Sequence, residues 1–182
     1  MNHLGTRRIE TERLILRPFV MEDARAMYIN WCADPEVTKY LTWPTYTSVD
    51  GAYEILDIWT QEYEKKDFYQ WAIELKALGQ PIGSIAVVEQ KEKAQVAHIG
   101  YALGRTWWRQ GFMSEALKAV MDFLFDEVGF NRLESRHDPN NPNSGKVMVK
   151  CGMKHECTMR QSDWNNQGIC DASWYALLKE ER

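Results

Sequence analysis

The chain has 182 residues, of which 45% are hydrophobic and 26% charged, a composition typical of a soluble globular domain. Its net charge of −4 argues against a nonspecific grip on the phosphates of nucleic acid, which usually requires a basic surface. No apolar stretch approaches the roughly 20 residues of a membrane span, and the charged N-terminus has no signal-peptide core. The sequence therefore predicts one cytoplasmic domain over residues 1–182, with neither nucleic acid nor a membrane as partner.

The predicted elements alternate between strands and helices. They are a strand at 11–19, helices at 21–32 and 49–64, strands at 68–78, 81–89 and 95–104, a long helix ending at Val128, a strand at 132–137, a helix at 142–151, and strands at 153–163 and 169–179. The long helix is the clearest, because apolar residues from Met113 to Val128 recur at steps of three and four, and Gly129 suits its C-terminal end. The order β-α-α-β-β-β-α-β-α-β-β predicts an α/β fold with helices on both faces of one mixed sheet.

The four cysteines are Cys32, Cys151, Cys157 and Cys170. Because no secretory signal is present, we expect free thiols in a reducing compartment rather than a disulfide framework. The last three, together with His155, have the composition of a zinc site, but structural zinc sites usually pair their ligands about two to four residues apart. We therefore expect no metal.

A strand, a short loop and a helix follow one another between Gly100 and Ala119. A loop that leads into a helix N-terminus presents unpaired backbone amides and the positive end of the helix dipole, which suits phosphate oxygens. Gly111 allows a ligand to approach the backbone closely, and Arg105 and Arg109 add positive charge. The pattern alone also fits an ordinary strand-to-helix turn, since it matches neither the Rossmann nor the Walker A fingerprint.

Four segments of the chain resemble, in order, the GNAT acetyltransferases. They are TERLILR at 11–17, GYAL at 100–103 with WRQGFMSEAL at 108–117, NPNSGKVMVKCGM at 141–153, and Asp171 followed by WYALL at 174–178. The resemblance is closest to the branch similar to the Rim-type ribosomal-protein N-terminal acetyltransferases, and it covers nearly the whole chain. It implies a single GNAT domain with acetyl-CoA as co-substrate.

The resemblance also implies where the co-substrate binds. Backbone amides near Tyr101, Ala102 and Leu103 are expected to stabilise an oxyanion. Asn141 is expected to bind the pantetheine arm. The residues expected at the pyrophosphate are Arg109, Gln110, Gly111, Phe112, Met113 and Ser114.

Two positions depart from the family pattern. Met113 is bulky where the family has Gly or Ala, so its side chain must point away from the pyrophosphate. Met148 stands where many members have a Tyr that protonates the leaving thiolate, and the resemblance suggests Ser144 as the acid instead. Asn141 has a second interpretation, because Asn before Pro142 is also a favourable helix N-cap that needs no ligand.

His98 is the predicted general base for acetyl transfer to an amine. The amine must be neutral to attack, yet a lysine-like amine with a pKa of about 10.4 is neutral to only about one part in 10³ at neutral pH. His98 lies two residues before Gly100, and a histidine pKa of about 6.5 suits proton uptake near neutrality. A half-buried histidine that hydrogen-bonds to a neighbour explains the same pattern equally well.

The acceptor is expected between the loops 39–48 and 162–168, where Trp43, Tyr46 and Trp164 are predicted to form an aromatic wall. The same residues also suit ordinary loops that cover the edge of the core. The predicted activity is transfer of acetyl from acetyl-CoA directly to a primary amine, either a protein N-terminal α-amine or a small-molecule amine. The alternative is a catalytically silent CoA-binding or regulatory module, and the sequence leaves a homodimer open.

Overall fold

Eight strands form one mixed sheet in the computed structural model, which describes residues 1–182. Their order across the sheet is β1-β2-β3-β4-β5-β6-β8-β7, and only the β5–β6 pair is parallel. The strands are β1 (Ile9–Glu10), β2 (Leu14–Arg17), β3 (Gln70–Leu75), β4 (Gln80–Lys91), β5 (Val96–Leu103), β6 (Arg132–His137), β7 (Lys154–Asn165) and β8 (Gly168–Leu178). The mixed sheet predicted from the sequence is confirmed.

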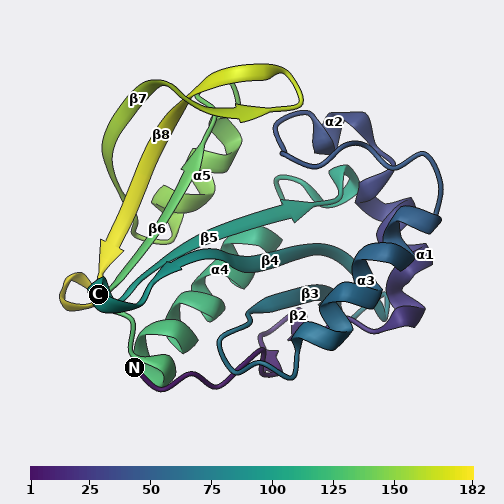
Figure 1. Ribbon diagram of the computed structural model, residues 1–182, viewed down its shortest axis with the longest axis horizontal. Helices are drawn as coiled ribbons and strands as arrows, with labels where there is room; N and C mark the ends of the chain where they lie inside the picture. The colour runs from purple at the N-terminus through teal and green to yellow at the C-terminus, as the bar shows by residue number, and fades with distance from the viewer.

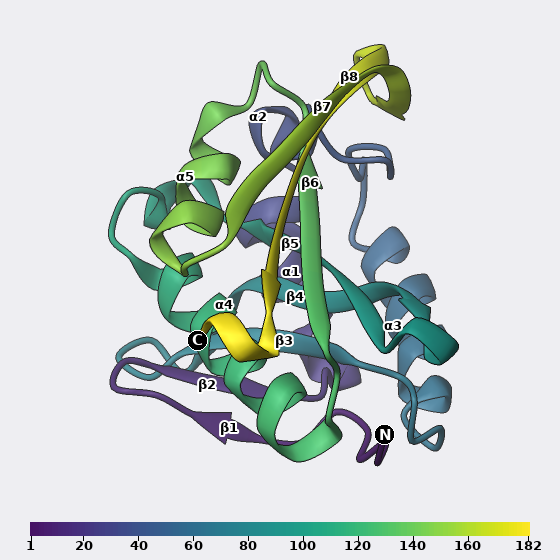
Figure 2. The ribbon, with the colours of Figure 1, turned by 90° about the vertical axis from the view of Figure 1, so that its left-hand side faces the viewer.

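Helices cover both faces of this sheet (Figure 1 and Figure 2). They are α1 (Ala24–Met27), α2 (Pro35–Thr38), α3 (Asp50–Glu62), α4 (Phe112–Phe123) and α5 (Pro142–Lys150), with 3-10 turns at Met21–Asp23, Glu92–Ala94, Arg105–Trp107 and Lys179–Glu181. α1 and α3 lie against one face of the sheet, and α4 and α5 lie against the other. None of the helices is both long and apolar enough to cross a membrane.

Two of the predicted helices extend beyond regular α-geometry. A 3-10 turn, α1 and a π-helical stretch (Tyr28–Cys32) follow one another without a break, and together they span the helix predicted at 21–32. α4 likewise continues as a π-helical stretch (Leu124–Val128) up to Gly129, whose left-handed φ of 92° ends the helix. The predicted ends of both helices are therefore confirmed.

Two short elements, β1 and α2, are not evident from the sequence pattern. Asp34 and Pro35 end the first helical segment as predicted, but they also begin α2. Pro35 takes the first position of α2, and Oδ1 of Asp34 accepts a 3.0 Å hydrogen bond from the Glu36 amide. α2 therefore leads the following loop toward the β7–β8 hairpin (Figure 1).

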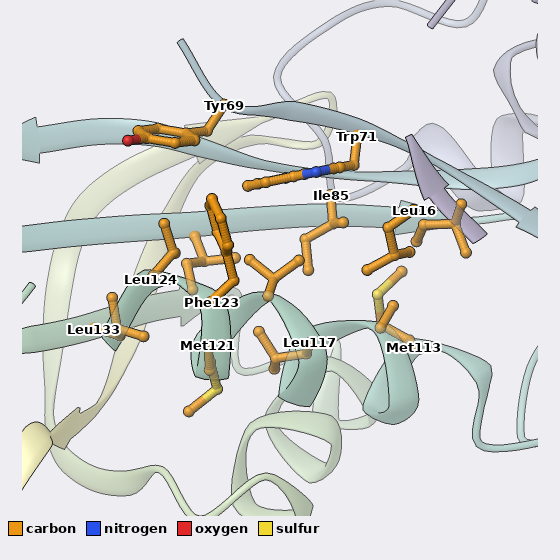
Figure 3. Packing of buried hydrophobic residues seen from close by; sticks show 14 of the residues in the cluster. Leu16, Tyr69, Trp71, Ile85, Met113, Leu117, Met121, Phe123, Leu124 and Leu133 are labelled. Carbon is orange, nitrogen blue, oxygen red and sulfur yellow. The ribbon is translucent and has the colours of Figure 1, made fainter. Parts of the chain in front are cut away.

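The larger part of the core lies between the sheet and α4 (Figure 3). Met113 and Phe123 point from α4 toward the strands, where they meet Leu16 and Trp71. Burial of apolar surface stabilises the fold by roughly 25 cal/mol per Å². This packing holds α4 in place, and with it the loop at Gly111 that begins the helix.

β5 and β6 separate after a short parallel stretch (Figure 1). They pair only over residues 96–98 of β5 and 132–134 of β6, and no residue of β5 beyond His98 pairs with β6. On its other side, the pairing of β5 with β4 shifts register between Val87 and Glu89, and bulges of this kind bend and twist a strand. The far ends of β5 and β6 therefore diverge and leave unpaired strand edges between them.

Candidate active site

A larger and a smaller cavity adjoin each other where β5 and β6 diverge. The larger has a volume of about 320 Å³ and is bordered by β5, the start of α4 and α5. The smaller has a volume of about 130 Å³ and is bordered by β5 and the C-terminal end of β6. The residues that line both are Tyr40, Leu41, Tyr101, Asn141 and Ser144. The two cavities therefore meet at these side chains.

The N-terminus of α4 presents free backbone amides to the larger cavity. None of the amides of residues 109–114 donates a hydrogen bond within the protein. Gly111 occupies the N-cap position with a φ of 83°, a left-handed conformation that glycine adopts without strain. Amides at a helix N-terminus lie at the positive end of the helix dipole. This loop therefore has the features of an anion-binding site.

The bulky side chain of Met113 does not obstruct this loop. It is 5% exposed and points into the core (Figure 3). Phe112, its neighbour, is also buried, and the Arg13 guanidinium lies over its ring at 4.2 Å from the ring centre. Both side chains of this turn face inward, which leaves the backbone of the loop open to a ligand.

Positive side chains surround the loop. Arg109, Lys146 and Lys150 line the larger cavity. Arg13, immediately before β2, contributes a contact that the local sequence pattern does not indicate, because its Nη1 donates a 2.9 Å hydrogen bond to the Gln110 carbonyl. The loop is therefore electropositive through side chains as well as through its amides.

Glu115, in the first turn of α4, holds Arg13 in this position. Its carboxylate accepts hydrogen bonds from the Thr11 hydroxyl at 2.6 Å, the Arg13 amide at 2.9 Å and Arg13 Nε at 2.7 Å. Burial by itself raises the pKa of Glu115, but the hydrogen bonds from Thr11 and Arg13 outweigh it and lower the pKa. Ionised Glu115 thus serves to position Arg13 beside the loop.

Asn141 occupies the N-cap position of α5, but its side chain makes no capping hydrogen bond. Pro142 follows at the first helical position. The Asn141 side chain instead lines both cavities. A side-chain amide without a hydrogen-bond partner is available to a ligand, and the contact of Asn141 with the cofactor stays a prediction.

Ser144 and Tyr101 form a pair of hydroxyl groups where the cavities meet. Ser144 Oγ donates a 3.2 Å hydrogen bond to Tyr101 Oη, which donates a 2.9 Å hydrogen bond to the Ser144 carbonyl. Burial raises the pKa of Tyr101, so its hydroxyl stays protonated. Met148 is fully buried in the core and carries no proton to donate. Ser144 and Tyr101 thus place two hydroxyl groups where the cavities meet, and the role of Ser144 as the acid stays a prediction.

His98 lies near the site but lines neither cavity. It is 5% exposed, its ring meets Trp174 edge-on at 5.3 Å, and its Nε2 lies 3.5 Å from Nη1 of Arg136. Burial, and then the Arg136 charge, lower the pKa of His98 to about 4. An effective general base has a pKa near the working pH, so this histidine is a weak base at neutral pH. The role of His98 as the base stays a prediction.

His137 lines the smaller cavity, but one of its ring nitrogens is hydrogen-bonded and the other is buried. Nδ1 lies 2.8 Å from the Asp138 carbonyl and therefore carries the proton that it donates. Nε2 is buried without a partner against α5, where a Cβ on Gly145 would lie 2.5 Å from it. His137 thus offers no free nitrogen to an amine in the cavity.

The aromatic residues predicted to form the acceptor wall lie outside both cavities. Trp43 and Tyr46 pack on each other with ring centres 5.5 Å apart, against the hydrophobic cluster beneath α1 and α3. Trp164 is 56% exposed at the end of the β7–β8 hairpin. Their role in acceptor binding stays a prediction, and the residues of the first loop that line the cavities are Tyr40 and Leu41.

The two loops predicted to flank the acceptor contact each other through Asn166. Its Nδ2 donates to the carbonyls of Thr38 and Trp43, both at 2.8 Å. Its backbone amide donates to the Leu41 carbonyl at 3.0 Å. These bonds tie the β7–β8 hairpin to the segment that places Tyr40 and Leu41 over the cavities.

The cysteines are all free thiols, and no group of three or more His, Cys, Asp or Glu side chains is arranged to hold a metal ion. Cys151 lies in the contact between α5 and α4, where its Sγ donates to the Ser114 carbonyl at 3.3 Å. Burial raises the pKa of Cys151 to about 11, so this thiol stays protonated.

Comparison with known proteins identifies the family. The profile of the family described as "Acetyltransferase (GNAT) domain" matches residues 13–154. The chain is 31% identical over 171 residues to "Uncharacterized N-acetyltransferase p20" of Bacillus licheniformis. The aligned region covers 94% of this chain and 96% of that protein. The chain therefore belongs to the GNAT acetyltransferase family, as its motifs predict.

Ribosomal-protein acetyltransferases are among the more distant relatives. Ribosomal protein uS5-alanine N-acetyltransferase of Escherichia coli (strain K12) is 29% identical over 59 residues, or 32% of this chain and 30% of that protein. The structure of "RimL- Ribosomal L7/L12 alpha-N-protein acetyltransferase in complex with Coenzyme A" has a TM-score of 0.85 at 20% identity, covering 97% of this chain and all 100% of that one. At this identity the likeness shows that the two proteins share the fold.

Proposed function

We propose that this protein transfers the acetyl group of acetyl-CoA directly to a primary amine, and that an α-amine such as a protein N-terminus is the preferred acceptor. The observation that carries the proposal is the run of free amides at residues 109–114, which borders one cavity while a second cavity adjoins it. A transferase for two substrates needs such a pair of adjoining spaces, and membership of the GNAT family supports the same chemistry.

The residues around the larger cavity fit acetyl-CoA, which supplies an activated acetyl thioester. The free amides at 109–114 suit the pyrophosphate. Two positive side chains lie close to this loop. A Cβ atom added to Gly111 would lie 3.4 Å from Arg13 Nη2 and 3.6 Å from Lys150 Nζ. The unpartnered side chain of Asn141 suits the amides of the pantetheine arm. The cavity thus offers complementary groups for the pyrophosphate and for the pantetheine arm of the donor.

Acetyl transfer requires charge stabilisation and the movement of two protons. Backbone amides on the unpaired edge of β5 beyond His98 stabilise the negative charge that develops on the acetyl oxygen. The amine nitrogen forms its bond to the acetyl carbon as the carbon–sulfur bond breaks, and the amine releases its proton to solvent. Ser144 Oγ gives a proton to the departing sulfur and regains one from solvent, while Tyr101 holds Ser144 in place.

The lining of the cavities favours an acceptor that loses its proton easily. The only imidazole in this lining is His137, and both of its nitrogens are engaged or covered. An α-amine with a pKa of about 8 is neutral to about one part in ten at neutral pH, whereas a lysine amine is neutral to about one part in 10³. An α-amine therefore needs much less help from a base.

A thiol-release assay tests the proposal. The protein is incubated with acetyl-CoA and a panel of peptides with free N-termini, their N-acetylated forms and small primary amines, and the free CoA thiol is measured. We expect release with free α-amines and none with the N-acetylated peptides. If CoA raises the melting temperature but no amine in the panel consumes acetyl-CoA, the protein is a CoA-binding module without transferase activity.

A further inference from the structure

A buried aspartate without a cationic partner is among the residues that line the smaller cavity. Asp138 follows directly after β6 and is 9% exposed. Its Oδ1 accepts a 2.8 Å hydrogen bond from the Asn140 amide, and its Oδ2 accepts a 2.9 Å hydrogen bond from Nδ2 of Asn165. A carboxylate offers about four lone-pair sites, so these two nitrogen donors, together with the Cys170 thiol that also hydrogen-bonds to Asp138, leave part of its capacity unused.

The other charge in this cavity is already balanced. Arg136 also lines the cavity, but its Nε donates a 2.5 Å hydrogen bond to Oδ2 of Asp163. Its guanidinium lies over the Trp174 ring, 5.1 Å from the ring centre. Asp163 therefore neutralises Arg136, whereas Asp138 forms no salt bridge. A buried charge without a partner is unfavourable, and a cationic ligand relieves that cost.

Both loops beside the cavities position this carboxylate. Asn165, which is 5% exposed near the end of the β7–β8 hairpin, supplies one of the two donors. Tyr40, from the loop after α2, donates a 3.0 Å hydrogen bond from Oη to the carbonyl of Asn140, whose amide supplies the other donor. The orientation of Asp138 therefore depends on segments from three parts of the chain.

We infer that Asp138 binds the acceptor in the smaller cavity as its ammonium form, before the amine loses a proton to solvent and attacks, and thereby selects cationic primary amines. The inference rests on the proposed function and adds the residue that recognises the acceptor. The smaller cavity meets the larger one at Tyr101 and Ser144, so an ammonium beside Asp138 lies next to the space for the acetyl group. A volume of about 130 Å³ admits the amine end of a substrate while the remainder extends outward.

Direct binding measurements test this inference independently of turnover. CoA-saturated protein is titrated in a calorimeter with tri-alanine amide, cadaverine and glucosamine, and with N-acetylated tri-alanine amide as the uncharged counterpart. The variants are Asp138→Asn and, as the matched control, Asp57→Asn, whose side chain is exposed on α3. We expect at least one amine to bind, its affinity to fall about 10- to 100-fold in Asp138→Asn, and the control to behave like the wild type.

The outcomes separate this inference from the proposed function. Equal affinity of the amines for wild type and Asp138→Asn, equal binding of the N-acetylated peptide, or no binding of any amine overturns the role of Asp138. Amine binding that depends on Asp138, without thiol release from acetyl-CoA, overturns the proposed function alone. The affinity for acetyl-CoA reports whether each variant is folded. Asp138→Ser, which removes the charge but retains an acceptor for the Asn140 amide, is the second variant.

Discussion

The side-chain amide of Asn165 donates a 2.9 Å hydrogen bond to the carboxylate of Asp138 and joins the β7–β8 hairpin to the end of β6. Both residues are buried. A hydrogen bond to a charged group contributes about 1.5–3 kcal/mol, and removing one partner leaves the other to be desolvated without compensation. The group proposed to recognise the acceptor is therefore coupled to the fold of the hairpin.

Asn165→Ala is expected to lower the free energy of unfolding by about 1–3 kcal/mol, because the Asp138 carboxylate loses a buried donor. The KM for the amine should rise, but less than in Asp138→Asn, since the carboxylate keeps its charge and loses only its fixed orientation. Urea denaturation and steady-state kinetics measure the two effects. Gln167→Ala, whose side chain is exposed in the same turn, is the control. Equal stability of the two variants would show that the hydrogen bond contributes nothing.

Gly111→Ala is expected to weaken acetyl-CoA binding by about tenfold or more, a loss of ~1.4 kcal/mol. The φ of 83° at this position is strained for alanine, and the added Cβ would stand in the loop 3.4 Å from Arg13 Nη2. Gly79→Ala is the matched control, because Gly79 also has a positive φ of 66° but lies in the β3–β4 turn with nothing within 4 Å. Calorimetry should show reduced affinity only for Gly111→Ala, and equal losses in both variants would contradict the role of the loop.

Ser144→Ala is expected to lower kcat by about 10²-fold with little change in the affinity for acetyl-CoA, because the departing thiolate loses its proton donor. Ser144→Thr retains a hydroxyl group and should recover most of the rate. Steady-state kinetics with a saturating amine acceptor measure both variants. If Thr is as slow as Ala at this position, the loss comes from altered packing against Tyr101 rather than from the missing proton.

The stability of the protein is expected to fall below neutral pH because of His98. Burial lowers the pKa of His98 from 6.5 to about 4, so between these values the unfolded chain binds a proton that the folded protein does not. This difference costs the wild type about 2 kcal/mol at about pH 5 relative to about pH 7. His98→Gln has no group that titrates in this range. Urea titrations should therefore show that, between about pH 7 and about pH 5, the free energy of unfolding of the wild type falls by about 2 kcal/mol relative to that of His98→Gln. A difference that stays constant with pH would refute the low pKa.

The kinetic role of His98 is a separate question. If His98 accepts the proton of the amine, His98→Ala lowers kcat near neutral pH and flattens the acidic limb of the pH profile. With a pKa of about 4, that limb should lie well below the pH at which an ordinary histidine titrates. Rates that are unchanged at every pH would remove His98 from the mechanism.

Local sequence signals were sufficient for the elements that carry the cofactor loop. The apolar steps from Met113 to Val128 predict α4 and its continuation, and Gly129 predicts the C-terminal end, because helix periodicity and a left-handed glycine depend only on near neighbours. The Asp34–Pro35 pair was informative but incomplete, since the same residues that end one helix also start the next.

Contacts between distant segments were not predictable in this way. The Arg13 amide meets the Glu115 carboxylate across 102 residues of sequence, and Asn166 meets the Thr38 carbonyl across 128. The burial of His98 was not predictable for the same reason. Its position two residues before Gly100 suggests a place in the site, but only the packing of Trp174 and Arg136 against it determines that the imidazole is buried.

The sequence by itself determined the GNAT family, the mixed sheet and the phosphate-type loop, because each of these depends on motifs and periodicities within short stretches of chain. Only the tertiary structure decided which charged side chain near the diverging ends of β5 and β6 has no partner of opposite charge. Asp163 pairs with Arg136, whereas Asp138 receives only neutral donors, among them Asn140 and Asn165. The physical reason is that charge compensation depends on which side chains the fold brings within a few ångströms, and separation along the chain does not report that distance.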